Sequence, residues 1–147
     1  MIEGIEHMGI SVSDMERSTD FYCGILGFKE VRTIEGAELL GKITGMPGCR
    51  ATIAHLVKGS SVLELFKYSE PNGKPIPPER IQADKGISHI GFRSSDVRED
   101  YRKLRDAGVR FISEPVEYRQ NVWLCYFYGP DNEVCEIRES EKPLSES

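Results

Sequence analysis

Long apolar runs are missing from this sequence of 147 residues. No segment approaches the about 20 consecutive apolar residues that a membrane helix requires, and the start of the chain lacks the basic, apolar and small-residue zones of a secretory signal. We therefore expect a cytoplasmic protein that does not span a membrane.

An excess of basic residues is also missing, because 19 Lys and Arg stand against 24 Asp and Glu and the formal net charge is −5. This balance repels phosphate backbones, so we expect a small-molecule substrate and no nucleic-acid partner. The four cysteines show no C-x-x-C spacing, which indicates buried free thiols rather than zinc ligands or disulfides; they are Cys23, Cys49, Cys125 and Cys135.

What the sequence does contain is an internal repeat. HMGISVSDMERSTDFYCGILGF, which begins at His7, is similar to HIGFRSSDVREDYRKLRDAGVRF, which begins at His89. His89 follows His7 by 82 residues, and Asp96 follows Asp14 by the same interval. Because self-similarity at a fixed spacing marks a repeated structural unit, we expect two modules of one plan.

Each module is predicted to have the order βαβββ, which places the protein in the α+β class. Strand-forming segments are expected at 5–12, 28–34, 50–58 and 62–68, and again at 87–93, 109–113, 122–128 and 133–139. One helix should follow Ser13-Asp14 and another Ser95-Asp96, and Ser13 with Glu16 matches a capping box. These helices should end at Gly27 and Gly108. A further short helix is expected at 37–44. The sequence Gly129-Pro130-Asp131-Asn132 predicts a hairpin turn.

The domain boundaries follow from this plan. Modules 5–68 and 87–139 are predicted to form a single domain, 1–139, joined by a Pro-rich linker, 69–86, whose prolines exclude a helix. Residues 140–147 are predicted to form a frayed polar tail.

Strand alternation puts His7 and His89 on the faces opposite the apolar rows of their strands. The last strand of each module holds one carboxylate among apolar neighbours, Glu64 in VLELF and Glu136 in VCEIR. Buried carboxylates need a compensating cation, and two imidazoles with two carboxylates suit a divalent metal ion. We predict that these four residues converge on one ion; the alternative is that each histidine is an ordinary core residue and each glutamate faces solvent.

Other polar and aromatic residues are weaker candidates. His55, in TIAHLV, has no histidine counterpart in the repeat and is interpreted as structural. Four further residues could contact a substrate or merely pack and be solvated: Arg93, Arg119, Trp123 and Tyr126.

Four segments carry a family resemblance: HMGISVSDMERSTDFYCGILGF, SVLELF, GISHIGF and YGPDNEVCEI. Over residues 5–139 the chain resembles the vicinal oxygen chelate superfamily, which contains glyoxalases, bleomycin resistance proteins and extradiol dioxygenases. The resemblance implies two βαβββ modules that form a curved mixed-sheet cup around a metal. In ligand pattern the chain is most similar to glyoxalase I (lactoylglutathione lyase), which implies metal ligands His7, Glu64, His89 and Glu136.

The same resemblance implies a metal-dependent lyase or isomerase that moves a proton next to a carbonyl, with Glu136 as catalytic base and Glu64 assisting. The ion would be Ni, Zn, Co, Mn or Fe, and a homodimer is expected, whose modules pair within one chain or across two. Bacterial glyoxalase I holds glutathione with an arginine and an asparagine at two places where this chain has Ser11 and Tyr68, and this departure argues against glutathione dependence. The epimerases have a glutamate base on the strand that corresponds to 49–57, a segment without a carboxylate here, which argues against the epimerase reaction. An epimerase like that for methylmalonyl-CoA, an extradiol-type dioxygenase and a metal-free antibiotic-binding protein are the alternatives.

Overall fold

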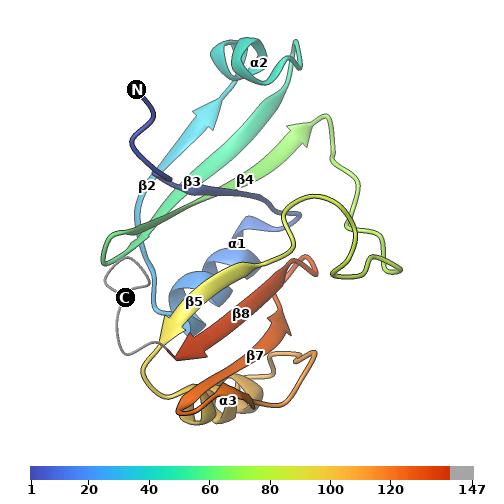
Figure 1. Ribbon diagram of the computed structural model, residues 1–147. Helices are drawn as coiled ribbons and strands as arrows, with labels where there is room; N and C mark the ends of the chain where they lie inside the picture. Colours follow the sequence, from blue (N-terminus) through green and yellow to red (C-terminus); the bar gives the residue numbers. More distant parts are fainter. Residues whose placement is uncertain (140–147) are drawn as a thin grey trace. The chain divides into compact units, whose positions relative to one another are not determined.

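The strands form two four-stranded mixed sheets, each with one parallel and two antiparallel pairings (Figure 1). The computed structural model describes residues 1–139, so the predicted polar tail at 140–147 lies outside the described residues. The chain divides after Pro75 into two compact units, each of which holds one sheet. The α+β class with two βαβββ modules is thereby confirmed.

The first unit has the strand order β1-β4-β3-β2. Its elements along the chain are β1 (Met8–Ser11), α1 (Met15–Thr19) with its π-helical continuation η1 (Asp20–Ile25), β2 (Lys29–Gly36), α2 (Glu38–Thr44), β3 (Arg50–Lys58) and β4 (Ser61–Glu70). The core of this unit is formed by apolar side chains of η1 and of the central strands, above all Tyr22, Leu56 and Leu65. The helix α2 lies at one end of β2 and β3 (Figure 1).

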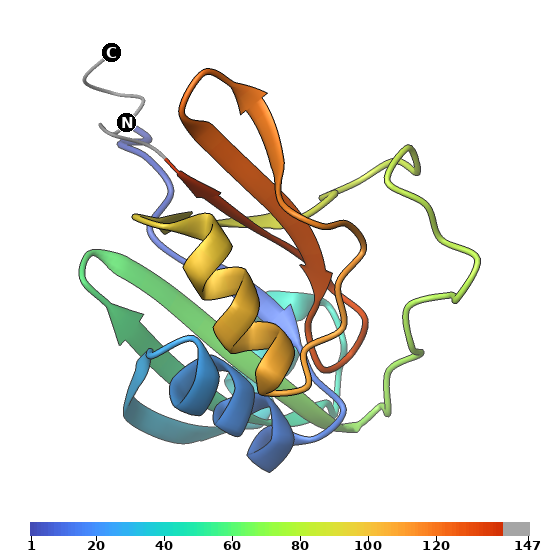
Figure 2. The same cartoon turned by 90° about the horizontal axis from the view of Figure 1, so that it is seen from below.

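The second unit repeats this arrangement with the order β5-β8-β7-β6. Its elements are β5 (Ile90–Ser94), α3 (Val97–Asp106), β6 (Val116–Arg119), β7 (Val122–Tyr128) and β8 (Val134–Glu139). Figure 2 shows α3 running along one face of this sheet. Its Val97 and Leu104 are buried, as are Cys125, Phe127 and Ile137 of the sheet.

The predicted helix starts and stops are confirmed, with one correction. Asp14 and Asp96 cap their helices by accepting hydrogen bonds from the amides of Arg17 (3.0 Å) and Glu99 (2.9 Å). The capping box on Ser13 is wrong, because the cap is one residue later. Beyond the helices, Gly27 and Gly108 have φ of 76° and 85°, a left-handed conformation in which glycine has no steric penalty.

The strand predicted at 109–113 is also wrong. One isolated bridge joins Phe111 to Phe127, and the edge strand is β6. The amides of Ile112 and Ser113 both donate to the Tyr126 carbonyl, and Pro115 has no amide proton with which to continue a ladder. The chain therefore pairs as a regular edge strand only after this proline.

The remaining boundaries shift by a few residues. The first strand of each module starts later than predicted, so His7 and His89 each stand immediately before their strand. The strand β4 continues to Glu70, which shortens the predicted linker at its start. Among residues 1–139, no helix is long and apolar enough to cross a membrane.

Candidate metal centre

In the first unit, the parallel pairing of β1 and β4 brings His7 to Glu64. Gly9 of β1 stands opposite Glu64 of β4, and His7 precedes Gly9 by two residues, so both side chains emerge on the same face. The His7 Nε2 atom lies 3.4 Å from the Glu64 Oε2 atom. The imidazole is 40% exposed and the carboxylate 18%, so the pair borders solvent.

The second unit builds an equivalent pair from β5 and β8. Gly91 stands opposite Glu136, and His89 precedes Gly91 by two residues. The His89 Nε2 atom lies 2.9 Å from the Glu136 Oε2 atom. Each module therefore produces one His–Glu pair by the same construction.

The two pairs differ in their electrostatic surroundings. Glu136 is buried, and among residues 1–139 His89 is the one side chain that forms an ion pair with it. A hydrogen bond to Glu6 raises the pKa of His7, and the negative charge of Glu64 raises it further, while burial acts in the opposite direction. Both carboxylates thus lie where a cation would be stabilised.

His55 is the neighbour of this site that sequence reasoning left out. Its Nε2 atom lies 3.0 Å from the Glu64 Oε1 atom and 3.0 Å from the Arg32 Nη2 atom, and its buried Nδ1 atom has no hydrogen-bond partner. His55 stands opposite Glu64 in the pairing of β3 with β4. In the second unit, Tyr126 stands opposite Glu136.

Tyr126 is therefore the structural counterpart of His55, a relation hidden in the sequence because the two residue types differ. The Tyr126 ring packs edge-on against His89, with centroids 5.1 Å apart. Burial and the charge of Glu136 raise the pKa of its hydroxyl, while the Arg138 guanidinium lowers it. Of the weaker candidates, Tyr126 is the one that contacts a His–Glu pair.

The other three weaker candidates have different surroundings. Trp123 lies under the Arg98 guanidinium of α3, 4.8 Å from the ring centroid, and Arg119 is on the exposed edge strand β6. Arg93 stands on β5 opposite Arg138. Trp123 thus belongs to the packing between α3 and its sheet.

The donor set fits a divalent ion. Two ligands bound cis to an ion at about 2.0–2.2 Å lie about 3 Å apart, which is close to the separation of nitrogen and oxygen within each pair. Imidazole with carboxylate suits Mn, Fe, Co, Ni and Zn. Within residues 1–139 no group of three or more His, Cys, Asp and Glu side chains is arranged to hold a metal. The convergence of the two pairs on one ion stays a prediction.

The cysteines take no part in this donor set. All four are free, and Cys49, Cys125 and Cys135 are buried while Cys23 is partly exposed. Burial, with a smaller effect of the Glu136 charge, raises the pKa of the Cys125 thiol to about 12. A neutral thiol is a poor metal ligand, so Cys125 serves as core packing.

Comparisons with known proteins agree with the fold. The sequence profile of the Glyoxalase/Bleomycin resistance protein/Dioxygenase superfamily matches residues 4–137. The 4-hydroxyphenylpyruvate dioxygenase of Pseudomonas aeruginosa is 30% identical over 120 residues, which are 80% of this chain and 32% of that longer protein.

The solved structures that are similar over nearly the whole chain include the following two. A glyoxalase family protein from Bacillus cereus has a TM-score of 0.85 at 21% identity and 95% coverage of both chains. The fosfomycin resistance protein FosX from Listeria monocytogenes, solved with Mn(II) and sulfate, has a TM-score of 0.65 at 19% identity and covers 99% of this chain and 98% of its own. These similarities show a shared fold.

Proposed function

Because this chain belongs to the Glyoxalase/Bleomycin resistance protein/Dioxygenase superfamily, we propose that it is a metal-dependent lyase or isomerase that moves a proton next to a carbonyl group. Members of that superfamily include dioxygenases and fosfomycin-resistance enzymes, so membership alone leaves the reaction open. The observation that supports our choice is the repeated His–Glu pair, one in each unit, with an imidazole nitrogen 3.4 Å or 2.9 Å from a carboxylate oxygen.

We propose that the two units act as one domain and that His7, Glu64, His89 and Glu136 hold one divalent ion. When bound, such an ion polarises a carbonyl oxygen and makes the neighbouring C–H bond more acidic. FosX, whose structure contains Mn(II), supports the expectation of a metal in this fold.

The carboxylates have the catalytic roles in this proposal. Glu136 takes the proton, because it is a buried carboxylate and no Lys or Arg among residues 1–139 forms an ion pair with it. Glu64 assists from the other pair. The contacts of His55 with Glu64 and of Tyr126 with His89 orient the two pairs.

Proton exchange tests this function with a panel of candidate substrates. The protein, loaded with Mn²⁺, Ni²⁺ or Zn²⁺, is incubated in D₂O with 2-hydroxy acids, 2-oxo acids and thiol adducts of 2-oxo aldehydes, and NMR follows the replacement of carbon-bound protons by deuterium. We expect exchange that needs a metal and is lost in Glu136→Gln. Exchange that continues unchanged in Glu136→Gln would contradict its role as base.

Dioxygenase chemistry is the second candidate, and the identity with 4-hydroxyphenylpyruvate dioxygenase favours it. Its hallmark is oxygen uptake by the Fe²⁺-loaded protein, measured with an oxygen electrode. We expect none, because Glu64 supplies a fourth protein ligand and so leaves fewer positions for both substrate and oxygen. Uptake that depends on substrate and survives Glu64→Ala would select the dioxygenase.

Mixed variants determine which chains supply the two pairs. His7→Ala and His89→Ala each lack one ligand. In a homodimer with sites shared between chains, an equal mixture that exchanges subunits regains about one quarter of the intact sites, because half of the dimers are mixed and each has one complete site. With sites formed inside one chain, the mixture regains none. Metal content after dialysis is the measurement.

A further inference from the structure

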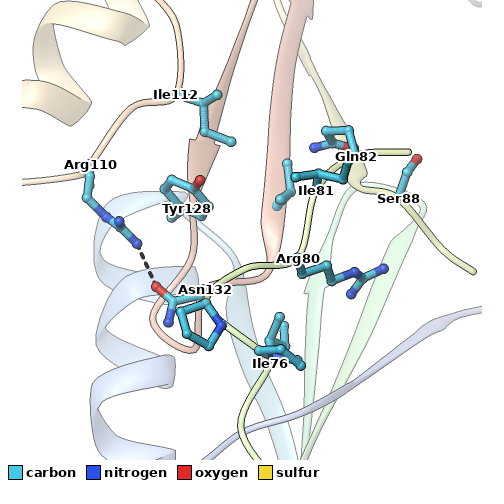
Figure 3. A pocket seen from close by; sticks show the side chains of 12 residues that line it. Ile76, Arg80, Ile81, Gln82, Ser88, Arg110, Ile112, Tyr128 and Asn132 are labelled. Atoms are coloured by element: carbon cyan, nitrogen blue, oxygen red, sulfur yellow. Dashed lines mark hydrogen bonds between the residues drawn. The ribbon is translucent and has the colours of Figure 1, made fainter. Parts of the chain in front are cut away.

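A cavity of about 400 Å³ lies within the second unit, between the segment that precedes β5 and the hairpin of β7 and β8 (Figure 3). Its walls combine apolar side chains with two guanidinium groups. Those used below are Ile81, Ile112, Tyr128, Val134, Arg80 and Arg110. The volume is in the range of small-molecule sites, about 300–1,000 Å³.

The cavity adjoins the second His–Glu pair. Tyr128 stands opposite Val134, and the next pair on the same face of the sheet is Tyr126 with Glu136. Since side chains on one face recur every second residue, the cavity begins about 7 Å along the strands from Glu136. Ser88, which also lines the cavity, contacts the His89 Nδ1 atom with its hydroxyl at 2.9 Å.

Arg110 is held in place but has no acidic partner among residues 1–139. Its guanidinium lies 4.0 Å from the centroid of the Tyr128 ring, and its Nη2 atom donates to the Asn132 side-chain oxygen at 2.6 Å (Figure 3). Arg80 donates through Nη2 to the Ile87 carbonyl at 2.7 Å. Within the part of the chain that the structure describes, neither guanidinium forms an ion pair with a carboxylate.

Arg110, an oriented guanidinium without a carboxylate partner among residues 1–139, in a chain of net charge −5, points to a local site for an anion. The apolar side chains add the second requirement, because Ile81 and Ile112 are 62% and 44% exposed and a hydrocarbon body would remove that apolar surface from water. A ligand that meets both requirements, the anion and the apolar surface, has a compact anionic head and a short hydrocarbon body.

We propose that this cavity binds the carboxylate end of the substrate, a small organic acid whose hydrocarbon body lies on Ile81, Ile112 and Tyr128. The carboxylate accepts hydrogen bonds from Arg110, and the other end of the molecule extends toward Glu136. This inference rests on the proposed function, since it assigns a substrate class to the same catalytic pair.

The test measures binding of three probes of similar shape to the full chain in EDTA: 3-methylbutanoate, the neutral 3-methylbutanamide and 2-methylpropylphosphonate. Ligand-observed NMR titration gives the affinities. We expect the carboxylate to bind at least about 10-fold more tightly than the amide, and Arg110→Gln to remove that preference. Arg102→Gln is the matched control, because it removes an exposed guanidinium of α3 that is paired with Glu99.

A second variant, Tyr128→Leu, removes the ring centred 4.0 Å from the Arg110 guanidinium and keeps the proposal testable if Arg110→Gln does not fold. It should weaken the carboxylate probe by about 3-fold or more. Equal affinities for acid and amide, or an unchanged preference in both variants, would overturn the proposal. Tighter binding of the phosphonate would overturn the carboxylate assignment.

Addition of Mn²⁺ then tests the adjacency. We expect the methyl signals of the bound probe to broaden in the wild-type protein and not in His89→Ala, because a paramagnetic ion acts on nearby nuclei. Binding of the acid in EDTA does not require a metal, so a protein that binds the probe yet no metal would refute the proposed function and leave the anion site standing. Absence of broadening while the metal is bound would refute the proposed adjacency of the anion site and the metal site.

Discussion

Removal of His89 tests the metal centre most directly, and the metal-free protein gives the first part of the test. In EDTA, His89→Ala leaves the Glu136 carboxylate, 10% exposed, without the imidazole at 2.9 Å. Loss of the partner of a buried charged group costs about 1–3 kcal/mol. We expect a decrease of that size in the free energy of unfolding, and a partial recovery when Glu136→Gln is added, because a neutral amide is less costly to bury.

The metal-loaded protein gives the second part. An ion that binds only the folded state, at a free concentration about 100 times its Kd, adds about 2.7 kcal/mol to the free energy of unfolding. Partners that merely orient a ligand already change metal affinity by about 10–100-fold. Loss of His89 itself should weaken binding by about 100-fold or more, so at the same concentration the gain falls to about 0.4 kcal/mol or less.

Urea unfolding with and without Mn²⁺ measures both effects, and the fluorescence of the single tryptophan, Trp123, reports on the second unit. Arg102→Ala on α3 is the control and should keep the full gain. Equal stabilisation of wild type and His89→Ala by Mn²⁺ would exclude His89 as a ligand. Equal stability of the two proteins in EDTA would show that the contact with Glu136 contributes nothing.

Three further predictions concern the base, a helix cap and the buried thiol. Glu136→Gln should lower metal-dependent turnover by about 10²–10⁴-fold, the size of a general-base contribution, whereas Glu117→Gln on the exposed edge strand should not change it. Asp96→Ala removes the acceptor that lies 2.9 Å from the Glu99 amide and should lower the free energy of unfolding by about 1 kcal/mol in urea, while Asp96→Asn keeps most of it. In the folded protein at pH 8, a disulfide reagent should modify Cys23 before Cys125, because the pKa of the buried Cys125 thiol is raised to about 12. Stability should fall as the pH rises above about 9, because the unfolded thiol ionises near its ordinary pKa while the folded thiol keeps its proton.

Each of these predictions has a clear contrary result. Equal turnover losses in both glutamate variants would point to misfolding rather than to loss of a base. An unchanged urea midpoint in Asp96→Ala would mean that water replaces the cap without cost. A Cys125→Ala protein that loses stability between about pH 9 and 12 as steeply as the wild type would assign the alkaline transition to another group.

Most of the fold could be predicted from the sequence because it depends on local signals. The alternation of Ile10 and Val12 with Gly9 and Ser11 assigns the buried face of β1, and the structure buries the two apolar residues. The acidic cap at Asp96 is likewise a local hydrogen bond. The error at 109–113 arose where local pattern and pairing disagree, since apolar residues favour a strand there but Pro115 and the shared Tyr126 carbonyl prevent a regular ladder.

The repeat, its spacing and the identity of the four candidate ligands were determined by the sequence alone, because a duplicated module has the same residue types at matched places. Only the tertiary structure revealed that His55 contacts Glu64, that Tyr126 is its counterpart, and that Arg80 and Arg110 border one cavity. Those relations depend on strand register and on how a proline-rich segment returns to its sheet. Neither is encoded in the period of the residues, because pairing joins positions that are distant along the chain.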